Sequence, residues 1–389
     1  MRIGAVFPLS GVTEDLAGQE ATGVEIAADL VNADGGVDGR PIRLDVRDLH
    51  DTADAASVID ALRAAGDVVV VGGYSSDLSI PASTAAAADG LVYWESGAVA
   101  DQLTGRGMPL VFRVGANGAR LGGNSGRFAI ELLAPRLGKT PGAMKVAIVA
   151  ADDDYARSVA DAAASATSSA GASVGRIVYE LARPDWAGVM GRLAAMAPDV
   201  IILAAHIPDG EAFRRAMVAA RLHVGALIGS TMAQCMDDFG DDLGPDAVGV
   251  FASDRPTSGF DPGALSAGAR AVYDRFASAW RQRVGGKPTE EGLSGFTAAW
   301  ALFHHVLPAA ASAGPLDPGA IAAAARLVDL PEGSLPNGAG LRFSADPSQL
   351  GQNERAAAVI WQWQAVQHSV VVWPPVFATG TISFVPLPS

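Results

Sequence analysis

Polar and aromatic side chains follow several apolar runs of this chain, close to the point where each run ends. Hydroxyl, phenol and imidazole groups hold small polar molecules by hydrogen bonds, so these positions are candidates for binding chemistry. The runs and the residues that follow them are 68–71 with Ser76, 91–94 with Ser96, 146–149 with Tyr155, 199–203 with His206, and 226–229 with Thr231.

Catalytic motifs are absent from the sequence or stand in the wrong context. The segment 171–175 spells Gly-x-Ser-x-Gly, but it follows a predicted helix and opens a strand, whereas a nucleophile elbow needs a strand and then a helix. Asp152, Asp153 and Asp154 suggest a metal site, but a charged first turn of a helix explains them better. We therefore predict no enzyme, no catalytic residue, no metal and no cofactor.

The runs that precede these residues predict an α/β protein. The run 68–71 consists of four valines, which is typical of a parallel strand with both faces buried. Strand and helix patterns alternate from the N-terminus, and a second series of the same kind begins near residue 146. Two successive series of this kind predict two doubly wound lobes. Helices are then expected over 264–284, 290–307 and 317–327, and strands over 340–343, 358–363 and 369–373.

Bulk properties exclude other classes of protein. The net charge is −14 and no basic patch is visible, so nucleic acid is not an expected partner. No uninterrupted apolar run is long enough for a transmembrane helix. Cys235 is the single cysteine, which excludes an intrachain disulfide. Met1 and Arg2 lead directly into a strand pattern, so a secretory signal is either already removed or absent.

Both ends of the chain resemble one family. Residues 3–11 form a strand and a Pro-Leu-Ser-Gly loop, and a helix with Gln19 and Gly23 leads to the turn 32–41. Gly351-Gln352-Asn353, the Trp-Gln-Trp run 361–363 and Trp373-Pro374-Pro375 resemble a C-terminal hairpin. Over nearly the whole chain, these features are similar to type I periplasmic binding proteins of the Leu/Ile/Val-binding branch.

The resemblance implies two doubly wound, Rossmann-like lobes joined by a three-segment hinge. The N-terminal lobe would hold residues 1–120 and 253–332, and the C-terminal lobe residues 121–252 and 333–389. In open α/β sheets, ligands bind at the carboxyl ends of the strands, and the candidate residues follow such ends.

The family's ligand contacts fall on particular residues here. Ser76 matches a residue that binds the ligand's carboxylate at a helix N-terminus, although Ser76 and Ser79 are also suited to cap that helix. Tyr155 matches an aromatic that closes over the ligand, or else a rim aromatic, and His206 stands where Tyr is frequent. The other ligand-binding candidates are Gly97, Ala98 and Thr231, and further possible contacts are Tyr74, Asp77, Ser96 and Arg120.

Two departures from the family pattern bear on the ligand. Thr231 replaces an acid that usually pairs the ligand's ammonium, and Val99 replaces a Thr hydroxyl. Both changes favour a ligand without a free ammonium. Asp77 or Glu95 remains as an alternative charge partner, and Arg120 either pairs a second carboxylate or is a solvated hinge residue.

The resemblance implies an extracytoplasmic solute-binding protein, monomeric and with its signal removed. It would deliver a small amino acid-like, aromatic or aliphatic carboxylate to the permease of an ABC importer by hinge closure. The alternative is a cytosolic ligand-sensing regulator of the same fold, similar to the amide-sensing negative regulators.

Overall fold

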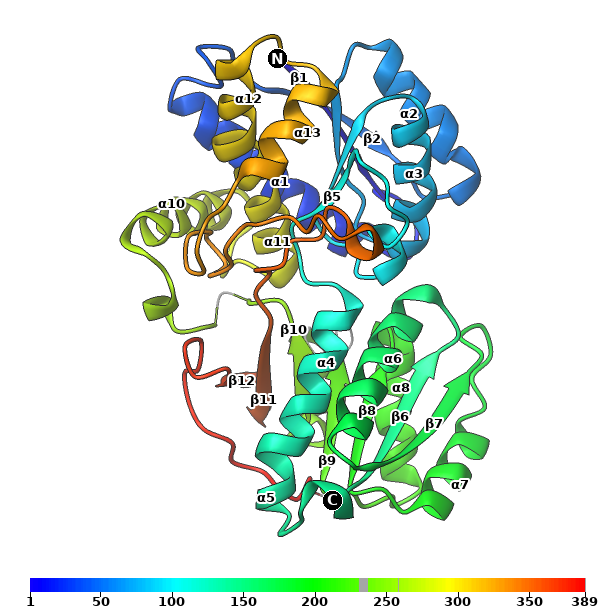
Figure 1. The fold of residues 1–389 in the computed structure, drawn as a ribbon. Coiled ribbons are helices and arrows are strands. Elements are labelled where there is room, and N and C mark those ends of the chain that lie inside the picture. The colour runs from blue at the N-terminus through cyan, green and yellow to red at the C-terminus, as the bar shows by residue number, and fades with distance from the viewer. Residues whose placement is uncertain (231–236, 258, 389) are drawn as a thin grey trace. The chain divides into compact units, whose positions relative to one another are not determined.

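Two β-sheets organise the chain, and in both of them parallel strands predominate (Figure 1). The computed structural model describes residues 1–230, 237–257 and 259–388. The first sheet has the strand order β2-β1-β3-β4-β5, and all its neighbouring strands are parallel. Its strands are β1 (Arg2–Phe7), β2 (Arg43–Asp48), β3 (Val69–Gly72), β4 (Val92–Glu95) and β5 (Val111–Arg113).

The second sheet has the strand order β12-β11-β10-β9-β8-β6-β7. The strands from β10 to β7 are parallel, whereas β11 and β12 are antiparallel to their neighbours. The strands are β6 (Lys145–Ala151), β7 (Ser173–Tyr179), β8 (Val200–Ala204), β9 (Ala226–Ser230), β10 (Phe251–Asp254), β11 (Val359–Ala365) and β12 (His368–Trp373).

The chain divides into two units, each with one sheet. Unit 1 comprises residues 1–116, 256–258 and 262–357, and unit 2 comprises residues 117–255, 259–261 and 358–389. Each unit is therefore assembled from segments far apart in the sequence.

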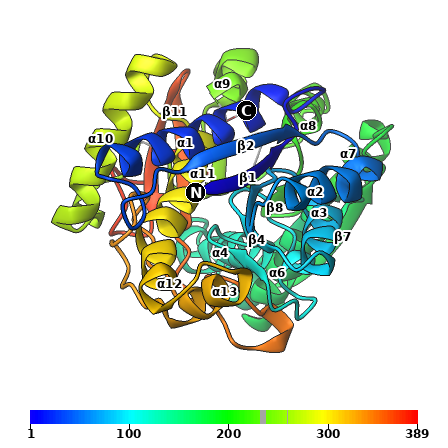
Figure 2. The same cartoon turned by 90° about the horizontal axis from the view of Figure 1, so that it is seen from above.

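Unit 1 buries its sheet between helices. Val6, Val70 and Tyr93 pack with Ile59 and Leu62 in a core of fully buried side chains. Figure 2 shows α2 and α3 on one side of β1 and β2 and α1 on the other. The helices of this unit are α1 (Glu14–Ala33), α2 (Ala55–Ala64), α3 (Ser76–Ala88), α10 (Ala267–Arg283), α11 (Glu290–Trp300), α12 (Leu307–Ala313) and α13 (Pro318–Leu327), with a π-helical turn over Ala301–Val306.

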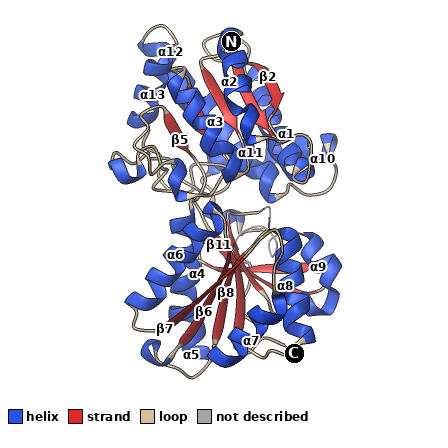
Figure 3. Cartoon of the chain, turned by 90° about the vertical axis from the view of Figure 1, so that its right-hand side faces the viewer, coloured by secondary structure: helices blue, strands red, loops and turns tan. Residues whose placement is uncertain are grey.

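Unit 2 has the same layered arrangement. Figure 3 shows α4 and α6 on one side of its sheet and α8 and α9 on the other. The helices are α4 (Gly118–Phe128), α5 (Ala134–Arg136), α6 (Asp154–Ser169), α7 (Trp186–Met196), α8 (Ile207–Ala219) and α9 (Asp237–Leu243), with a π-helical turn over Ala129–Leu133.

Glycines allow two helix pairs to approach very closely. A Cβ on Gly23 of α1 would lie 2.2 Å from the carbonyl oxygen of Gly292 in α11. A Cβ on Gly122 of α4 would lie 2.0 Å from the carbonyl oxygen of Val159 in α6. Real Cβ atoms do not approach carbonyl oxygens so closely, so both helix crossings require glycine at these positions.

The parallel parts of the two sheets have equivalent strand orders. In each unit the first strand lies between the second and the third. The direction in which successive strands are added to the sheet therefore reverses between β1 and β3 in unit 1 and between β6 and β8 in unit 2. Ligands of open α/β sheets bind outside the carboxyl ends of the strands at such switch points. The loops after these strands therefore carry the candidate site in each unit.

The predicted two-sheet α/β fold is confirmed. The main unit boundaries fall after residues 116, 255 and 357, whereas boundaries after 120, 252 and 332 were predicted. The last boundary differs most: residues 333–389 were predicted to lie in the second lobe, whereas residues up to 357 belong to unit 1. The reason is a set of buried amide contacts: Asn353 Nδ2 donates to the carbonyls of Val114 and Gly340, at 2.9 Å each. The strand expected over 340–343 is reduced to isolated bridges at Leu341 and Phe343.

No helix within the described part of the chain has the length and apolarity needed to cross a bilayer.

Candidate functional site

Glu95 organises the strand-end loops of unit 1. It is the last residue of β4, and its side chain is completely buried. Its Oε1 accepts hydrogen bonds from the backbone N–H groups of Ser96 (3.0 Å), Gly97 (2.8 Å) and Ala98 (2.8 Å). Successive backbone N–H groups that converge in this way form an anion-binding nest, and here the anion belongs to the chain itself.

The same carboxylate also reaches the neighbouring loop. Glu95 Oε2 accepts a hydrogen bond from the N–H of Gly73, at 3.3 Å, just after β3. Hydrogen bonds to an ionised acceptor are stronger than those between neutral groups, so Glu95 holds the β3 and β4 loops together.

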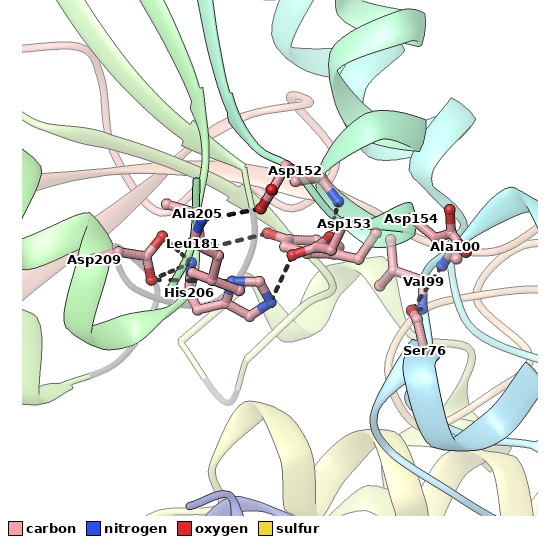
Figure 4. Close-up of polar contacts among 12 residues, drawn as sticks. Ser76, Val99, Ala100, Asp152, Asp153, Asp154, Leu181, Ala205, His206 and Asp209 are labelled. Carbon is pink, nitrogen blue, oxygen red and sulfur yellow. Dashed lines mark hydrogen bonds and ion pairs between the residues drawn. The ribbon is translucent and has the colours of Figure 1, made fainter. Parts of the chain in front are cut away.

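Ser76 continues this pattern along the loop. It is the first residue of α3, and its Oγ accepts hydrogen bonds from the N–H groups of Val99 (3.2 Å) and Ala100 (3.0 Å), as Figure 4 shows. Together, Glu95 and Ser76 accept hydrogen bonds from every backbone N–H between residues 96 and 100. Because a hydroxyl has two acceptor lone pairs and one donor, the proton of Ser76 remains able to bind an acceptor.

Arg113 holds the loop that follows β4 by hydrogen bonds to its carbonyl groups. It is completely buried at the end of β5, and its Nη1 donates to the carbonyls of Ala98 (3.2 Å) and Ala100 (2.7 Å). Its Nε donates to Gln352 Oε1 at 2.6 Å. This guanidinium therefore fixes the position of the loop that follows β4.

Glu20 brings a second carboxylate to the same turn. Its side chain projects from α1 and is completely buried. A Cβ added to Gly97 would lie 2.4 Å from Glu20 Oε2 and 2.8 Å from Oε1, so the carboxylate lies directly against Gly97. Burial raises the pKa of the nearby Tyr93 phenol well above its usual value, and the charges of Glu95 and Glu20 act in the same direction.

The strand-end loops of unit 2 bring Tyr155 and His206 together. The Tyr155 hydroxyl donates to the carbonyls of Ser230 (2.6 Å) and Ala205 (3.1 Å), at the ends of β9 and β8. Its ring meets the His206 imidazole edge to face, with the centroids 5.1 Å apart. His206 Nε2 lies 3.4 Å from Asp153 Oδ2 (Figure 4).

The acidic residues of this unit have structural roles. Asp153 Oδ1 caps α6 by accepting from the N–H of Ala156 at 2.7 Å, and Asp152 accepts from the N–H of Leu181 at 2.9 Å. Asp209 caps α8 by accepting from the N–H of His206, and Tyr179 donates to the same carboxylate. Burial, with the Asp209 charge in addition, raises the pKa of the Tyr179 phenol. A helix cap therefore accounts for Asp153, and a hydrogen bond to the turn after β7 accounts for Asp152.

The comparison with known families decides what kind of protein this is. The model of the family described as periplasmic binding protein matches residues 1–360. The chain belongs to this family.

Similar proteins place this periplasmic binding protein in the branched-chain amino acid branch. Leu/Ile/Val-binding protein homolog 8 of Brucella abortus is 30% identical over 99% of this chain and 93% of that protein. Two structures share the fold: a branched-chain amino acid transporter substrate-binding protein of Streptococcus pneumoniae with isoleucine (TM-score 0.75, 20% identity, 96% and 99% coverage) and a solute-binding protein of R. palustris with benzoate (TM-score 0.74, 18% identity, 98% and 97% coverage).

The predicted site residues of this periplasmic binding protein are distributed over both units. Ser76, Gly97 and Ala98 lie together in the loops after β3 and β4 of unit 1, and Tyr155 and His206 meet in unit 2. Tyr74 is buried with a φ of 69°, Ser96 is buried, Asp77 is exposed in the first turn of α3, and Arg120 is half-buried in the first turn of α4. Thr231 and Cys235 lie outside the described residues.

Hydrogen bonds to the backbone of the periplasmic binding protein bear on the predictions for Gly97, Ala98 and Ser76. Gly97 and Ala98 were predicted as ligand-binding residues, and their N–H groups are hydrogen bonded to Glu95. The capping alternative for Ser76 is replaced by a contact with the next loop, because its Oγ meets Val99 and Ala100.

The positions of Glu20 and Arg113 beside the loop that follows β4 were not predicted from the sequence. A signal for Glu20 was available, since it falls on the buried face of α1 with Ala17 and Val24, three residues after one and four before the other. Arg113 likewise stands between the apolar residues Phe112 and Val114 at the end of a buried strand. Glu20 and Arg113 are both charged residues within an apolar pattern. Since charged residues are rarely fully buried without a partner, such a position indicates a specific contact.

Proposed function

We propose that this protein is the extracytoplasmic solute-binding component of an ABC importer, and that its ligand is a small amino acid-like, aromatic or aliphatic carboxylate. Family membership supports a substrate-binding role, and the relatives with isoleucine and benzoate show that the fold serves carboxylates of both kinds. We further propose that the lobes close over the ligand and that the closed form is delivered to the permease.

The observation that carries the ligand proposal is the geometry of Ser76. Its Oγ is held in place by the N–H groups of Val99 and Ala100, so its remaining hydrogen-bonding capacity is that of a donor. It stands at the N-terminus of α3, where the helix dipole favours a negative charge. A carboxylate at this position would meet a fixed hydroxyl donor and the positive end of a helix.

We propose Tyr155 and His206 as the ligand contacts of unit 2. Both follow strands at the switch point of the second sheet. The Tyr155 ring is held in place by its hydroxyl, whose single proton lies between the carbonyls of Ser230 and Ala205. A fixed aromatic face suits the apolar part of an amino acid or an aromatic acid.

A thermal-shift screen tests the proposed function. The screen should cover amino acids, aromatic carboxylates including benzoate, amides and short organic acids. A compound present at a hundredfold excess over its Kd should stabilise the protein by about 2.7 kcal/mol. If no compound of these classes raises the unfolding temperature, the proposed ligand class is wrong.

Ser76→Ala then tests the carboxylate contact. Loss of a hydrogen bond to a charged group should weaken binding by about 1.5 kcal/mol or more. Ser312→Ala is the matched control, because this Ser lies on α12 in the same unit and its hydroxyl bonds only locally, to the carbonyl of Pro308. Calorimetry that gave equal affinities for both variants would remove Ser76 from the site.

A further inference from the structure

We infer that Arg113 and Gln352 connect the loop 96–100 to two of the segments through which the chain leaves unit 1. Both are positioning residues, because they act through this loop and through the backbone of those segments. The inference rests on the proposed function, which places the ligand beside the loop. It deepens that function by stating how the state of the loop reaches the passages between the units.

The carbonyl groups of the loop 96–100 are held by a guanidinium. Arg113 Nη1 donates to the carbonyls of Ala98 (3.2 Å) and Ala100 (2.7 Å). Arg113 is completely buried, and its guanidinium is planar and rigid. Hydrogen bonds from a charged donor are stronger than those between neutral groups, so the loop and the guanidinium move together.

Gln352 extends this contact to a second part of the chain. Its Oε1 accepts a hydrogen bond from Arg113 Nε at 2.6 Å, and its Nε2 donates to the carbonyls of Gly115 (3.0 Å) and Asn353 (3.1 Å). The residue is buried. One amide group therefore contacts the guanidinium, the segment that follows β5 and its own backbone.

Backbone hydrogen bonds fix the two segments to each other. The N–H of Arg113 donates to the carbonyl of Gly351, and the N–H of Asn353 donates to the carbonyl of Arg113, at 2.9 Å each. The chain passes from unit 1 to unit 2 after residue 116 and again after residue 357. The segments that lead to these two passages therefore begin in one hydrogen-bonded cluster.

This cluster couples the loop to the passages. A molecule bound at Ser76 would restrict the loop 96–100, since the Ser76 hydroxyl accepts from two of its N–H groups. The restriction would reach both segments through Arg113 and Gln352, because coupling is carried by contiguous hydrogen bonds between groups that move together. Coupling is also reciprocal, so a loss of the Gln352 contact must loosen the loop. The connection can therefore be tested without a ligand.

Residue-resolved hydrogen exchange on ligand-free protein makes this test. Gln352→Met removes both amide contacts and keeps an unbranched side chain of similar size. The N–H groups of Val99 and Ala100 should then exchange about tenfold faster, because local opening becomes easier when a hydrogen bond to a charged group is lost. Gln349→Met is the matched control, since it makes the same change at an exposed position of the same segment and should leave these rates unchanged.

The location of the effect distinguishes coupling from a general loss of stability. The amides of β1 belong to the same unit but lie outside the cluster, so their exchange rates should change less than about twofold. Gln352→Glu keeps an acceptor for Arg113 Nε and should retain the slow exchange of Val99 and Ala100. Equal acceleration in β1 and in the loop would make Gln352 a general structural residue and would overturn the inference. Unchanged rates in Gln352→Met would overturn it as well.

A measurement on ligand-bound wild-type protein needs no variant. L-Isoleucine and benzoate are the probes, and calorimetry first establishes which of them binds. The bound probe should slow exchange at Val99 and Ala100 and also at the N–H of Asn353, about tenfold in each case. In Gln352→Met, the slowing at Asn353 should be lost while that in the loop remains.

The outcomes separate the inference from the proposed function. Slower exchange in the loop of wild-type protein without slower exchange at Asn353 overturns the inference and leaves the proposed function standing. If neither probe nor any other compound of the screen binds, the proposed function falls, and the exchange rates of ligand-free Gln352→Met still decide whether Gln352 is coupled to the loop.

Discussion

Glu95 shows how one side chain can take over the hydrogen bonding of a whole loop. Its carboxylate is completely buried, yet four backbone N–H groups donate to it, so the charge is solvated by the chain and not by water. A buried charge without such donors would be very costly. The conformation of the turn 96–98 therefore depends on the charge of this one residue.

Glu95→Gln should lower the free energy of unfolding by about 2 kcal/mol. The amide oxygen can still accept from the turn, but it carries no full charge, and the amide NH2 would face the N–H of Gly73, which is also a donor. Chemical denaturation measures the change. Glu332→Gln, on the exposed surface, should change stability by less than about 0.5 kcal/mol. Equal stabilities of the two variants would contradict the role given to Glu95.

His305 should make stability depend on pH below neutrality. Burial, and then the neighbouring His304, lowers the pKa of His305 to about 4 in the folded protein, whereas an unfolded His titrates near 6.5. Between these values the unfolded chain binds more protons, so stability is complete above about pH 6.5 and falls as the pH approaches 4.

The measurement is the free energy of unfolding between pH 4 and 7. His305→Gln should flatten the profile by less than about 1 kcal/mol per pH unit, because one proton sets the upper limit and the ring is partly exposed. His368→Gln replaces an exposed His and should leave the profile as in the wild type. Parallel profiles for all three proteins would show that His305 does not contribute.

At the scale of elements, the helix pairs α1–α11 and α4–α6 depend on close backbone approach. Gly23 and Gly122 each stand where a Cβ would collide with a carbonyl oxygen of the facing helix. Such crossings bring backbones together with little side chain between them, so any added atom must push the helices apart.

Gly23→Ala should destabilise the protein by about 1 to 3 kcal/mol, the usual cost of overpacking. Gly18→Ala is the matched control on the same helix, since nothing lies within 4 Å of the added Cβ. That change should be neutral or stabilising by about 0.5 to 1 kcal/mol, because Ala is the better helix former. Thermal unfolding of both variants measures the difference, and a loss of equal size in Gly18→Ala would show that packing is not the cause.

The sequence predicted the elements better than the contacts between them. The four valines 68–71 and the run 200–203 identify buried strands. A strand that is covered on both faces needs apolar side chains at every position, which produces such a continuous run. By contrast, Gly23 and Gly292 meet across more than 260 residues of chain, and no local pattern specifies that pairing.

The candidate site shows the same difference between local features, which the sequence predicts, and contacts between distant residues, which it does not. Ser76 and Tyr155 could be proposed from the sequence because they follow apolar runs and match family positions, and both are local features. The engagement of the Gly97 and Ala98 N–H groups by Glu95 depends on the folded shape of the turn, and the approach of Glu20 depends on where α1 lies. The third boundary was misplaced for a similar reason, because Asn353 binds to the distant residue Val114.

At the scale of the whole molecule, the repeated passage of the chain between the units predicts a change of shape on binding. The chain passes from one unit to the other mainly at residues 116–117, 255–256 and 357–358. Hinge closure of the kind proposed above moves domains about a few such backbone segments.

Small-angle scattering should show a modest decrease in the radius of gyration when a ligand from the screen saturates the protein. A compound from the same screen that does not bind serves as the control and should leave the radius unchanged. An unchanged radius with a bound ligand, verified by calorimetry on the same sample, would count against closure.

The interleaved order of the two units has a consequence for synthesis on the ribosome. Unit 1 begins the chain but is completed only by the segment that ends at residue 357, and unit 2 then still lacks β11 and β12. Until those strands emerge, β10 is an open sheet edge whose unpaired N–H and C=O groups can join another chain. A nascent chain interrupted after residue 357 would therefore carry one finished unit together with one that is prone to aggregate.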